Sequence, residues 1–198
     1  MRDLGTLPKR LLLSAPISCG LFLLSLSTLR TATGVAAATG REAPEFPSLE
    51  AASWAGPPTS LASLRGNVVL LNVWTFGCIN CRRTLPWVES VHERFGKRGV
   101  AVIGVHSPEF DYESSVKDVE KARKRERLLY PSFIDNSHAY WRALENDYWP
   151  TVYLIDKAGR VRRVQVGEVH AGDRAATALE GEIELLLAEA AVHTPTEK

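Results

Sequence analysis

The most informative stretch of the sequence for the fold is residues 74–81, Trp74-Thr-Phe-Gly-Cys78-Ile-Asn-Cys81. The run that leads into it, Val68–Trp74, is apolar and rich in β-branched residues, which predicts a buried strand. The run that follows carries apolar residues three or four positions apart, which predicts a helix over residues 79–94. The two cysteines therefore fall where a strand ends and a helix begins.

The spacing of Cys78 and Cys81 indicates redox chemistry. At the first turn of a helix, free backbone N–H groups and the helix dipole stabilise a thiolate, which is the nucleophilic form of cysteine. Cys78 is expected at this position, exposed to solvent. Cys81 lies about one turn further on and faces the same way, so it can attack a mixed disulfide formed on Cys78. The chemistry that this arrangement allows is thiol–disulfide exchange.

Other uses of the two cysteines stay open at this point. One is a purely structural disulfide, although a bridge that closes so small a loop constrains the unfolded chain little. Zinc requires four ligands at suitable spacing, and the histidines of the body are scattered. Copper is harder to dismiss because soft thiolates select Cu(I). A copper chaperone would use Cys78, Cys81 and a histidine such as His170.

The rest of the chain alternates between strand and helix patterns. A charged helix over residues 113–128 is expected to carry the ion pairs Glu113–Lys117 and Glu120–Lys124. The other predicted elements are strands at 99–105, 132–135 and 151–156, a short helix at 137–145, a hairpin strand at 160–166, and a closing helix with an apolar stripe from Ala176 to Leu187. This order predicts an α/β fold in which a central mixed sheet is flanked by helices on both faces.

Composition and charge agree with one globular domain. The chain has 198 residues, of which 45% are hydrophobic and 24% charged, a mix that argues against disorder and against a multi-span membrane protein. The formal net charge of +1 offers no general attraction to nucleic acid, so no nucleic-acid partner is expected. The charge is uneven, however, because residues 1–38 carry four basic side chains and one acidic one.

Residues 1–38 have the pattern of a targeting segment. Lys9 and Arg10 precede an uncharged, mostly apolar run at 11–29, and a small-residue tract with Ala-x-Ala sites follows. We expect either a cleaved signal peptide or an N-terminal membrane anchor, because the run approaches the length of about 20 residues that spans a bilayer. Both readings place the body outside the cytoplasm, with membrane contact only through this segment.

The cysteine stretch and a later motif together resemble a known family. Trp149-Pro150-Thr151 opens a strand about 70 residues after the cysteines, and this combination resembles the thioredoxin fold. More closely, it resembles the extracytoplasmic TlpA-like oxidoreductases and the thioredoxin-like domain of DipZ-type proteins. The matching segments are Ser60–Gly66, Cys78–Pro86, Gly104–Phe110, Tyr148–Asp156 and Gly167-Glu168. The resemblance covers about residues 45–190. Residues 39–59, rich in Pro, Gly, Ser and Ala, are expected to form a linker and leading loops, with a thioredoxin-like domain at 60–192 and a tail at 193–198.

The resemblance also implies a role for each cysteine and for the residues around them. Cys78 corresponds to the nucleophile and Cys81 to the resolving thiol, and the partners are protein thiols and disulfides together with an upstream redox donor. Pro150 corresponds to a cis-proline that packs against the cysteine pair. The other residues expected at the site are Trp74 and Phe76, as an apolar collar, and Trp149, facing a substrate. No cofactor and no metal are implied.

Two departures from the family pattern leave the proton acceptor for Cys81 open. Asn72 occupies the place of the buried acid of thioredoxin, and Thr84 occupies the place of a glutamate in several TlpA-like chains. Glu109 and Glu168, both in loops at strand ends, are the candidates to substitute.

A thiol peroxidase on the same fold is a further alternative. That chemistry usually needs a Pro-x-x-x-Thr-x-x-Cys arrangement around the reactive thiol. Thr75 is correctly placed three residues before Cys78, but Leu71 stands where the proline would be. The physiological substrate and the net direction of electron flow do not follow from the sequence.

Overall fold

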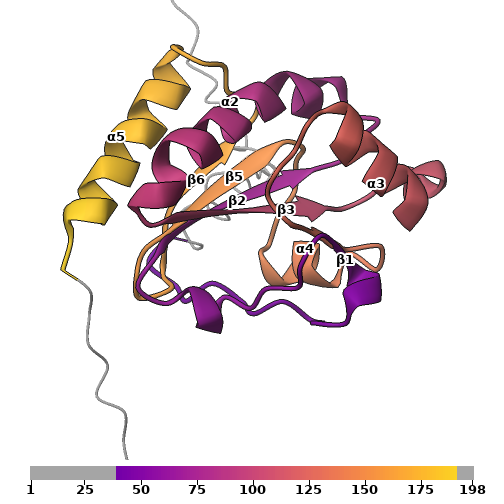
Figure 1. Ribbon diagram of the computed structural model, residues 1–198, viewed down its shortest axis with the longest axis horizontal. Helices are drawn as coiled ribbons and strands as arrows, with labels where there is room; N and C mark the ends of the chain where they lie inside the picture. Colours follow the sequence, from indigo (N-terminus) through magenta and orange to yellow (C-terminus); the bar gives the residue numbers. More distant parts are fainter. Residues whose placement is uncertain (1–38, 191–198) are drawn as a thin grey trace, which may run out of the picture.

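The core of the protein is one sheet of six strands in the order β1-β4-β3-β2-β5-β6 (Figure 1). A computed structural model describes residues 39–190, so the expectations for residues 1–38 and for the tail at 193–198 lie outside the described residues. The strands are β1 (Trp54–Ala55), β2 (Val68–Trp74), β3 (Val100–His106), β4 (Ser132–Ile134), β5 (Thr151–Ile155) and β6 (Val161–Val166). The helices are α2 (Ile79–Phe95), α3 (Val116–Arg125), α4 (Ala139–Ala143) and α5 (Arg174–Ala188), with short 3-10 turns at η2 (Ala51–Ser53), η3 (Ala62–Leu64), η4 (Gly96–Arg98) and η5 (Asp111–Glu113).

The sheet is mixed, as predicted, and its register gathers the site at one edge. β2 runs parallel to β3, with Trp74 opposite His106, and antiparallel to β5, with Val73 opposite Thr151. The carboxyl ends of β2 and β3 and the amino end of β5 therefore meet. The loops that leave this edge carry the cysteines, the segment after His106, and Pro150.

Helices cover both faces of the sheet (Figure 1). β2 is buried on both sides, because Val68, Leu70 and Trp74 join one apolar cluster while the alternate residues join the other. The first cluster packs under α2 and α5, and the second packs under α4 and the N-terminal segment. A strand covered on both faces reads as a continuous apolar run, which is the pattern that the sequence shows at 68–74.

The two long helices form where their apolar spacing predicts them. In α2 the buried stripe includes Leu85, Val88, Val91 and Phe95, although Pro86 lies within the helix. In α5 the buried residues are Ala176, Leu179, Ile183 and Leu186. Asp173 caps α5 by accepting a hydrogen bond from the backbone N–H of Ala176 at 2.7 Å, which satisfies one of the free donors of the first turn.

The helix predicted from residue 113 begins later, and its predicted ion pairs are wrong. Ser115 is the N-cap of α3, accepting from the Asp118 N–H, and the helix ends at Arg125. Glu113 lies before the cap in η5 and is fully buried, so it forms no pair with Lys117. Glu120 lies near Arg123 at 3.8 Å rather than pairing with Lys124. The helix begins after Ser115 because a serine side chain accepts well from the free N–H groups of the first turn. The Glu113 carboxylate instead accepts from the backbone of Gly77, Glu109 and Phe110.

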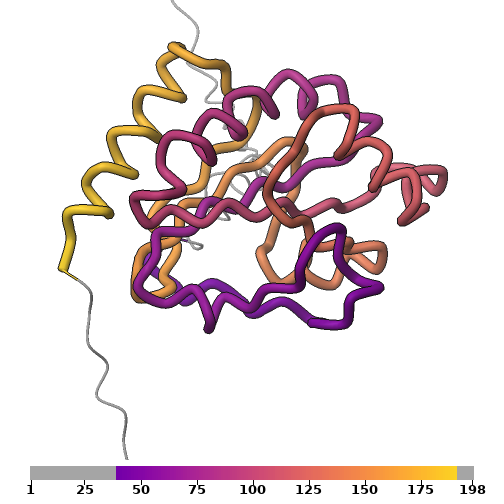
Figure 2. Tube along the Cα trace, viewed as in Figure 1, coloured from indigo at the N-terminus to yellow at the C-terminus, as the bar shows by residue number. Residues whose placement is uncertain are grey.

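The segment at 39–59 is irregular, yet it belongs to the folded body. Figure 2 traces it along one face of the sheet before β2. Ala43, Phe46 and Trp54 are buried there, and β1 pairs antiparallel with β4 at the sheet edge. The indole N–H of Trp54 donates to the carbonyl of Ser48 at 2.9 Å. Among the helices of residues 39–190, none has the length and apolar character needed to cross a bilayer.

Candidate active site

Cys78 and Cys81 form a disulfide at the start of α2, with their Cα atoms 5.3 Å apart. Cys78 is the N-cap of the helix, and its sulfur accepts a hydrogen bond from the Cys81 backbone N–H at 3.1 Å. Cys81 is completely buried, whereas Cys78 is partly exposed. The strand-to-helix junction therefore presents the Cys78 sulfur to solvent, as the spacing predicted, and it buries Cys81, which the spacing did not predict.

Cys78 opens into a pocket of about 500 Å³. The residues that line it are Gly77, Cys78, Ile79, Asn80, Glu109, Asp147, Tyr148 and Trp149. They come from the cysteine turn, from the loop after β3 and from the loop before β5. Three segments that are distant in sequence thus surround the Cys78 sulfur.

The loop before β5 carries the predicted pair Trp149 and Pro150. The peptide bond between them is cis, as the resemblance implies. Pro150 is buried and directly precedes Thr151, which pairs with Val73 near the end of β2. Trp149 is partly exposed, its indole N–H donates to the Ser107 carbonyl at 2.9 Å, and its ring lies 4.1 Å from the ring of Trp141. The indole that lines the pocket is therefore held in place.

Trp74 and Phe76 pack around His106 at the end of β3. Trp74 is fully buried and meets the imidazole edge-on at 5.3 Å, and Phe76 stacks on it at 5.5 Å. Phe76, Cys78 and the buried Cys81 also share one apolar cluster. The two aromatic side chains therefore form an apolar surround that includes both the cysteines and the histidine.

His106, the last residue of β3, is completely buried. Burial lowers its pKa from the usual 6.5 to about 4, so the ring is neutral at pH 7. Its Nε2 atom lies 3.3 Å from the hydroxyl of Thr75. Thr75, the residue that a peroxidase would need beside its thiol, is buried and faces this histidine.

Glu113 is the site residue that the sequence missed. Its carboxylate is fully buried and accepts three backbone N–H hydrogen bonds, from Gly77 at 2.8 Å, Glu109 at 2.6 Å and Phe110 at 3.0 Å. It links the loop after β3 to the residue that precedes Cys78. Helical periodicity assigned Glu113 to an exposed ion pair, and no local pattern marks it as buried.

The two predicted proton acceptors are not equivalent in the structure. Glu109 lines the pocket beside Cys78. Glu168 lies near the second turn of α2, where it accepts from Arg83 at 3.4 Å and lies 2.9 Å from the imidazole of His170. The structure thus brings Glu109, but not Glu168, to the pocket that Cys78 lines.

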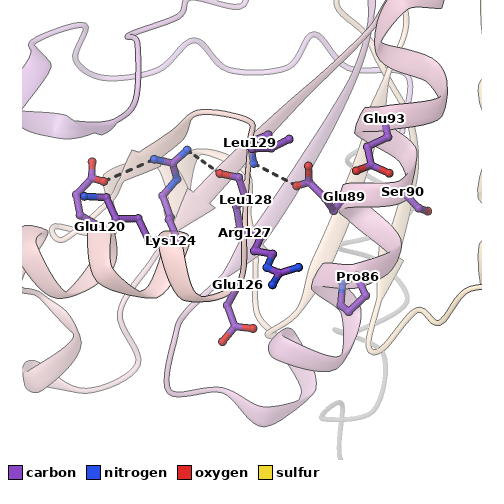
Figure 3. A pocket seen from close by; sticks show the side chains of 11 residues that line it. Pro86, Glu89, Ser90, Glu93, Glu120, Lys124, Glu126, Arg127, Leu128 and Leu129 are labelled. Carbon is purple, nitrogen blue, oxygen red and sulfur yellow. Dashed lines mark hydrogen bonds and ion pairs between the residues drawn. The ribbon is translucent and has the colours of Figure 1, made fainter.

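A larger hollow, about 710 Å³, lies between α2 and the end of α3 and contains no cysteine (Figure 3). Arg123, at its edge, donates to the carbonyls of Leu128 and Tyr130. Glu89 accepts from the Leu129 N–H at 3.2 Å, and burial raises the pKa of that carboxyl. In this hollow, Arg123 and Glu89 therefore form hydrogen bonds with the backbone of residues 128–130, the segment after α3.

The ligand set that a copper chaperone would need does not come together. No three His, Cys, Asp or Glu side chains of residues 39–190 are grouped as a metal site. His170 contacts Glu168, and neither contacts the cysteine pair.

The mixed sheet and the C-x-x-C disulfide at the start of α2 are the features of a thioredoxin-fold protein. The chain belongs to the AhpC/TSA family, whose profile matches residues 39–164. Protein DipZ of Mycobacterium tuberculosis is 43% identical over 111 residues, which are 56% of this chain and 16% of DipZ. Thiol-disulfide oxidoreductase ResA of Geobacillus thermodenitrificans is 31% identical over 132 residues, which are 67% of this chain and 71% of ResA.

Solved structures agree with this assignment. A thiol:disulfide interchange protein, DsbE, from Chlorobium tepidum superimposes with a TM-score of 0.65 at 25% identity, covering 75% of this chain and 97% of that one. The similarities confirm the predicted thioredoxin-like α/β fold and the class of thiol–disulfide oxidoreductase. The chain spans only about 16% of the length of the DipZ protein that it matches.

Proposed function

We propose that the chain exchanges electrons with protein thiols and disulfides through a mixed disulfide on Cys78. The observation that carries the proposal is the asymmetry of the two sulfurs: Cys78 caps α2 and lines an open pocket, whereas Cys81 is fully buried. Exchange requires that the attacking and attacked sulfurs meet. A substrate can meet Cys78, and Cys81 is left to resolve the intermediate.

In the reducing direction, the Cys78 thiolate attacks one sulfur of a substrate disulfide. A bond forms between Cys78 and the substrate, the substrate disulfide breaks, and the released thiolate takes up a proton. Cys81 then loses its proton, and its thiolate attacks the Cys78 sulfur, which releases the second substrate thiolate for protonation. The substrate has gained two electrons, and an upstream dithiol donor reduces the resulting Cys78–Cys81 disulfide. The reverse sequence oxidises a substrate.

Trp149 and Pro150 are proposed to bind the substrate peptide. Within residues 39–190, the backbone N–H and C=O of Trp149 make no hydrogen bond, although they lie at the pocket beside Cys78. Extended peptides bind to unpaired backbone of this kind, with side-chain pockets adding specificity. Pro150 has no N–H, so it presents no competing donor to the sulfurs. Trp74 and Phe76 are proposed to stabilise the site through the apolar cluster that they share with the two cysteines.

Glu109 is the proposed proton acceptor for the resolving thiol. Its carboxylate lines the pocket and has no ion-pair partner within residues 39–190. Glu168 is less suited, because Arg83 and His170 already engage its oxygens. A general base needs a free lone pair within reach of the proton, directly or through one water.

The proposed location is outside the cytoplasm, by secretion or by an N-terminal anchor. The support is the basic and apolar pattern of residues 1–38. N-terminal sequencing and fractionation of the native protein test this part. A cytoplasmic form that begins at Met1 contradicts it.

Alkylation and trapping test the roles of the two cysteines. In the reduced protein at neutral pH, iodoacetamide should modify Cys78 much faster than Cys81, because Cys78 is accessible and caps a helix. The variant Cys81→Ser should trap mixed disulfides with protein substrates, and the matched variant Cys78→Ser should not. Faster modification of Cys81 would reverse the assignment. Consumption of peroxide without a protein partner would support the peroxidase alternative instead.

A further inference from the structure

The Glu113 carboxylate connects two segments that lie far apart in the chain, the turn before Cys78 and the loop after β3. One oxygen accepts from Gly77, which directly precedes Cys78, and the other accepts from Glu109 and Phe110 of the loop after β3. An ionised carboxylate is costly to bury unless hydrogen bonds compensate for the lost water, and here three N–H groups do so. Glu113 thus fastens the cysteine turn to the body of the protein.

The contact depends on the absence of a side chain at Gly77. A Cβ atom built there would overlap Oε1 of Glu113 and would lie 2.6 Å from the hydroxyl of Tyr112. Glycine lets a backbone N–H approach a neighbouring group this closely. Gly77 and Glu113 therefore act as a matched pair beside the reactive cysteine.

The charge of Glu113 opposes the effect of the helix on Cys78. The first turn of α2, including the Cys81 N–H that donates to the Cys78 sulfur, favours a thiolate there. A fixed carboxylate close by disfavours the same thiolate, because like charges repel more strongly where water is excluded. A dithiol whose thiolate is stabilised gives a more oxidising pair, and destabilising the thiolate gives a more reducing one.

The other charged groups around the cysteine turn are Arg82 and Arg83 of α2, His106 of β3, Asp111 of η5, and Glu109 and Asp147 of the pocket. Both arginines are engaged by carboxylates, at 3.2 and 3.4 Å. The pKa of His106 is about 4, so the ring carries no charge at pH 7. The three acids are exposed, and their fields are screened by water and salt. Glu113 is the buried charge that touches the turn itself.

We infer that Glu113 is a positioning residue that holds the Cys78 turn and biases the Cys78–Cys81 pair toward its disulfide form, so that the protein acts as a reductant. The inference rests on the proposed function, because it concerns the reduction potential of the same Cys78–Cys81 pair. It assigns no proton transfer to Glu113, whose oxygens are occupied by N–H donors.

The variant Glu113→Gln tests the inference with a minimal change in shape. An amide has one acceptor oxygen, which can keep the hydrogen bonds to Glu109 and Phe110. Its NH₂ group then faces the Gly77 N–H, so the link to the cysteine turn breaks and the charge is lost. We expect the equilibrium constant against glutathione, at about pH 8, to shift about tenfold toward the dithiol, equivalent to about 30 mV. The pH midpoint of Cys78 alkylation should fall by about one unit.

Asp156→Asn is the matched control. Asp156 is also a buried carboxylate that accepts backbone N–H groups, from Ala158 and Arg160. It follows β5, whose last residue pairs with Val69 at the opposite end of β2 from the cysteines. Asp156→Asn should lower thermal stability and leave both the potential and the alkylation profile unchanged.

The outcomes separate the inference from the proposed function. A folded Glu113→Gln protein with the wild-type potential and alkylation profile overturns the inference, as does an equal shift in Asp156→Asn. If wild-type protein exchanges no disulfide with any protein substrate, the proposed function fails, while the alkylation profile still reports on Glu113. If Glu113→Gln does not fold, amide hydrogen exchange of Gly77 in the unmodified protein decides. Strong protection supports the contact, and exchange at the rate of an unprotected amide overturns it.

Discussion

Two pockets within residues 39–190, the one beside Cys78 and the larger one beside α3, differ in what their charged side chains do. In the larger pocket, between α2 and the end of α3, Glu89 accepts from the Leu129 N–H (Figure 3). Arg123 donates to the carbonyls of Leu128 and Tyr130. In the smaller pocket, Glu109 and Asp147 have no ion-pair partner within the described part of the chain and stand beside a half-exposed sulfur. The larger hollow is built around structural hydrogen bonds, and the smaller one leaves its polar groups free to meet a ligand.

The comparison shows that volume is a poor guide to the reactive site. The pocket of about 710 Å³ has no cysteine in its lining, whereas the pocket of about 500 Å³ holds Cys78 at a helix N-terminus. Substitutions in the larger pocket should therefore change stability, and substitutions in the smaller one should change exchange.

Arg123→Met should have the largest effect, and only on stability. The carbonyls of Leu128 and Tyr130 lose a donor that is itself almost buried, which should lower the free energy of unfolding by about 2–4 kcal/mol. Urea unfolding measures this loss. The equilibrium with glutathione should stay at the wild-type value, and a clear shift would show that the two pockets are coupled.

His106 should make stability depend on pH. Its folded pKa is about 4 and its unfolded pKa is about 6.5, so the unfolded chain binds the proton first as the pH falls. The stabilising contribution is complete above about pH 6.5 and is lost progressively down to about pH 4. Between pH 7 and pH 5 the loss should be about 2 kcal/mol.

Urea unfolding of wild type and His106→Gln across this pH range checks the prediction. The stability difference between the two proteins should shrink by about the same 2 kcal/mol as the pH falls from 7 to 5. A difference that does not change with pH would mean that His106 is not the group responsible.

Trp149→Ala should slow exchange with protein substrates about tenfold, because it removes the indole that lines the pocket and packs against Trp141. Leu129→Ala is the control from the larger pocket, where the side chain is 70% exposed. Turnover of a protein disulfide measures both variants. Equal slowing in the two would contradict a substrate role specific to Trp149.

Glu109→Gln should have the smallest effect, and its sign should depend on the charge of the disulfide. Removing a carboxylate beside Cys78 should speed the reaction with anionic oxidised glutathione about two- to threefold and slow it with cationic cystamine, more at low salt. Glu93→Gln, an exposed carboxylate of the larger pocket, should change neither rate. Slowing that is common to both disulfides is the additional effect expected from the proposed role of Glu109 as the proton acceptor for Cys81.

Local patterns succeeded where burial follows the chain's own periodicity. β2, α2 and α5 form where apolar spacing predicts them, because each element buries a face defined by its own residues. The position of Cys78 at the helix N-cap was also predicted, since a strand is followed directly by a helix at this point of the sequence. The position of Pro150 beside β2 came from the family resemblance, and the antiparallel register of β5 agrees with it.

Long-range contacts decided what the periodicity could not. Glu113 matched a helical ion pair with Lys117, but its actual donor on Gly77 is 36 residues away. The segment at 39–59 looked like a linker because of its Pro, Gly and Ser content, yet Phe46 and Trp54 find an apolar face that belongs to distant strands. Neither partner is visible in a short window of sequence.

The sequence by itself determined the class of fold and the reactive pair, because strand and helix periodicity and the C-x-x-C spacing are local properties. Only the tertiary structure decided which carboxylate is buried against the cysteine turn. A buried carboxylate persists where the folded chain supplies N–H donors, and the donors of Glu113 come from two segments that meet only when β2 and β3 pair. Glu168, with the same chemistry, meets arginine and histidine at the surface instead.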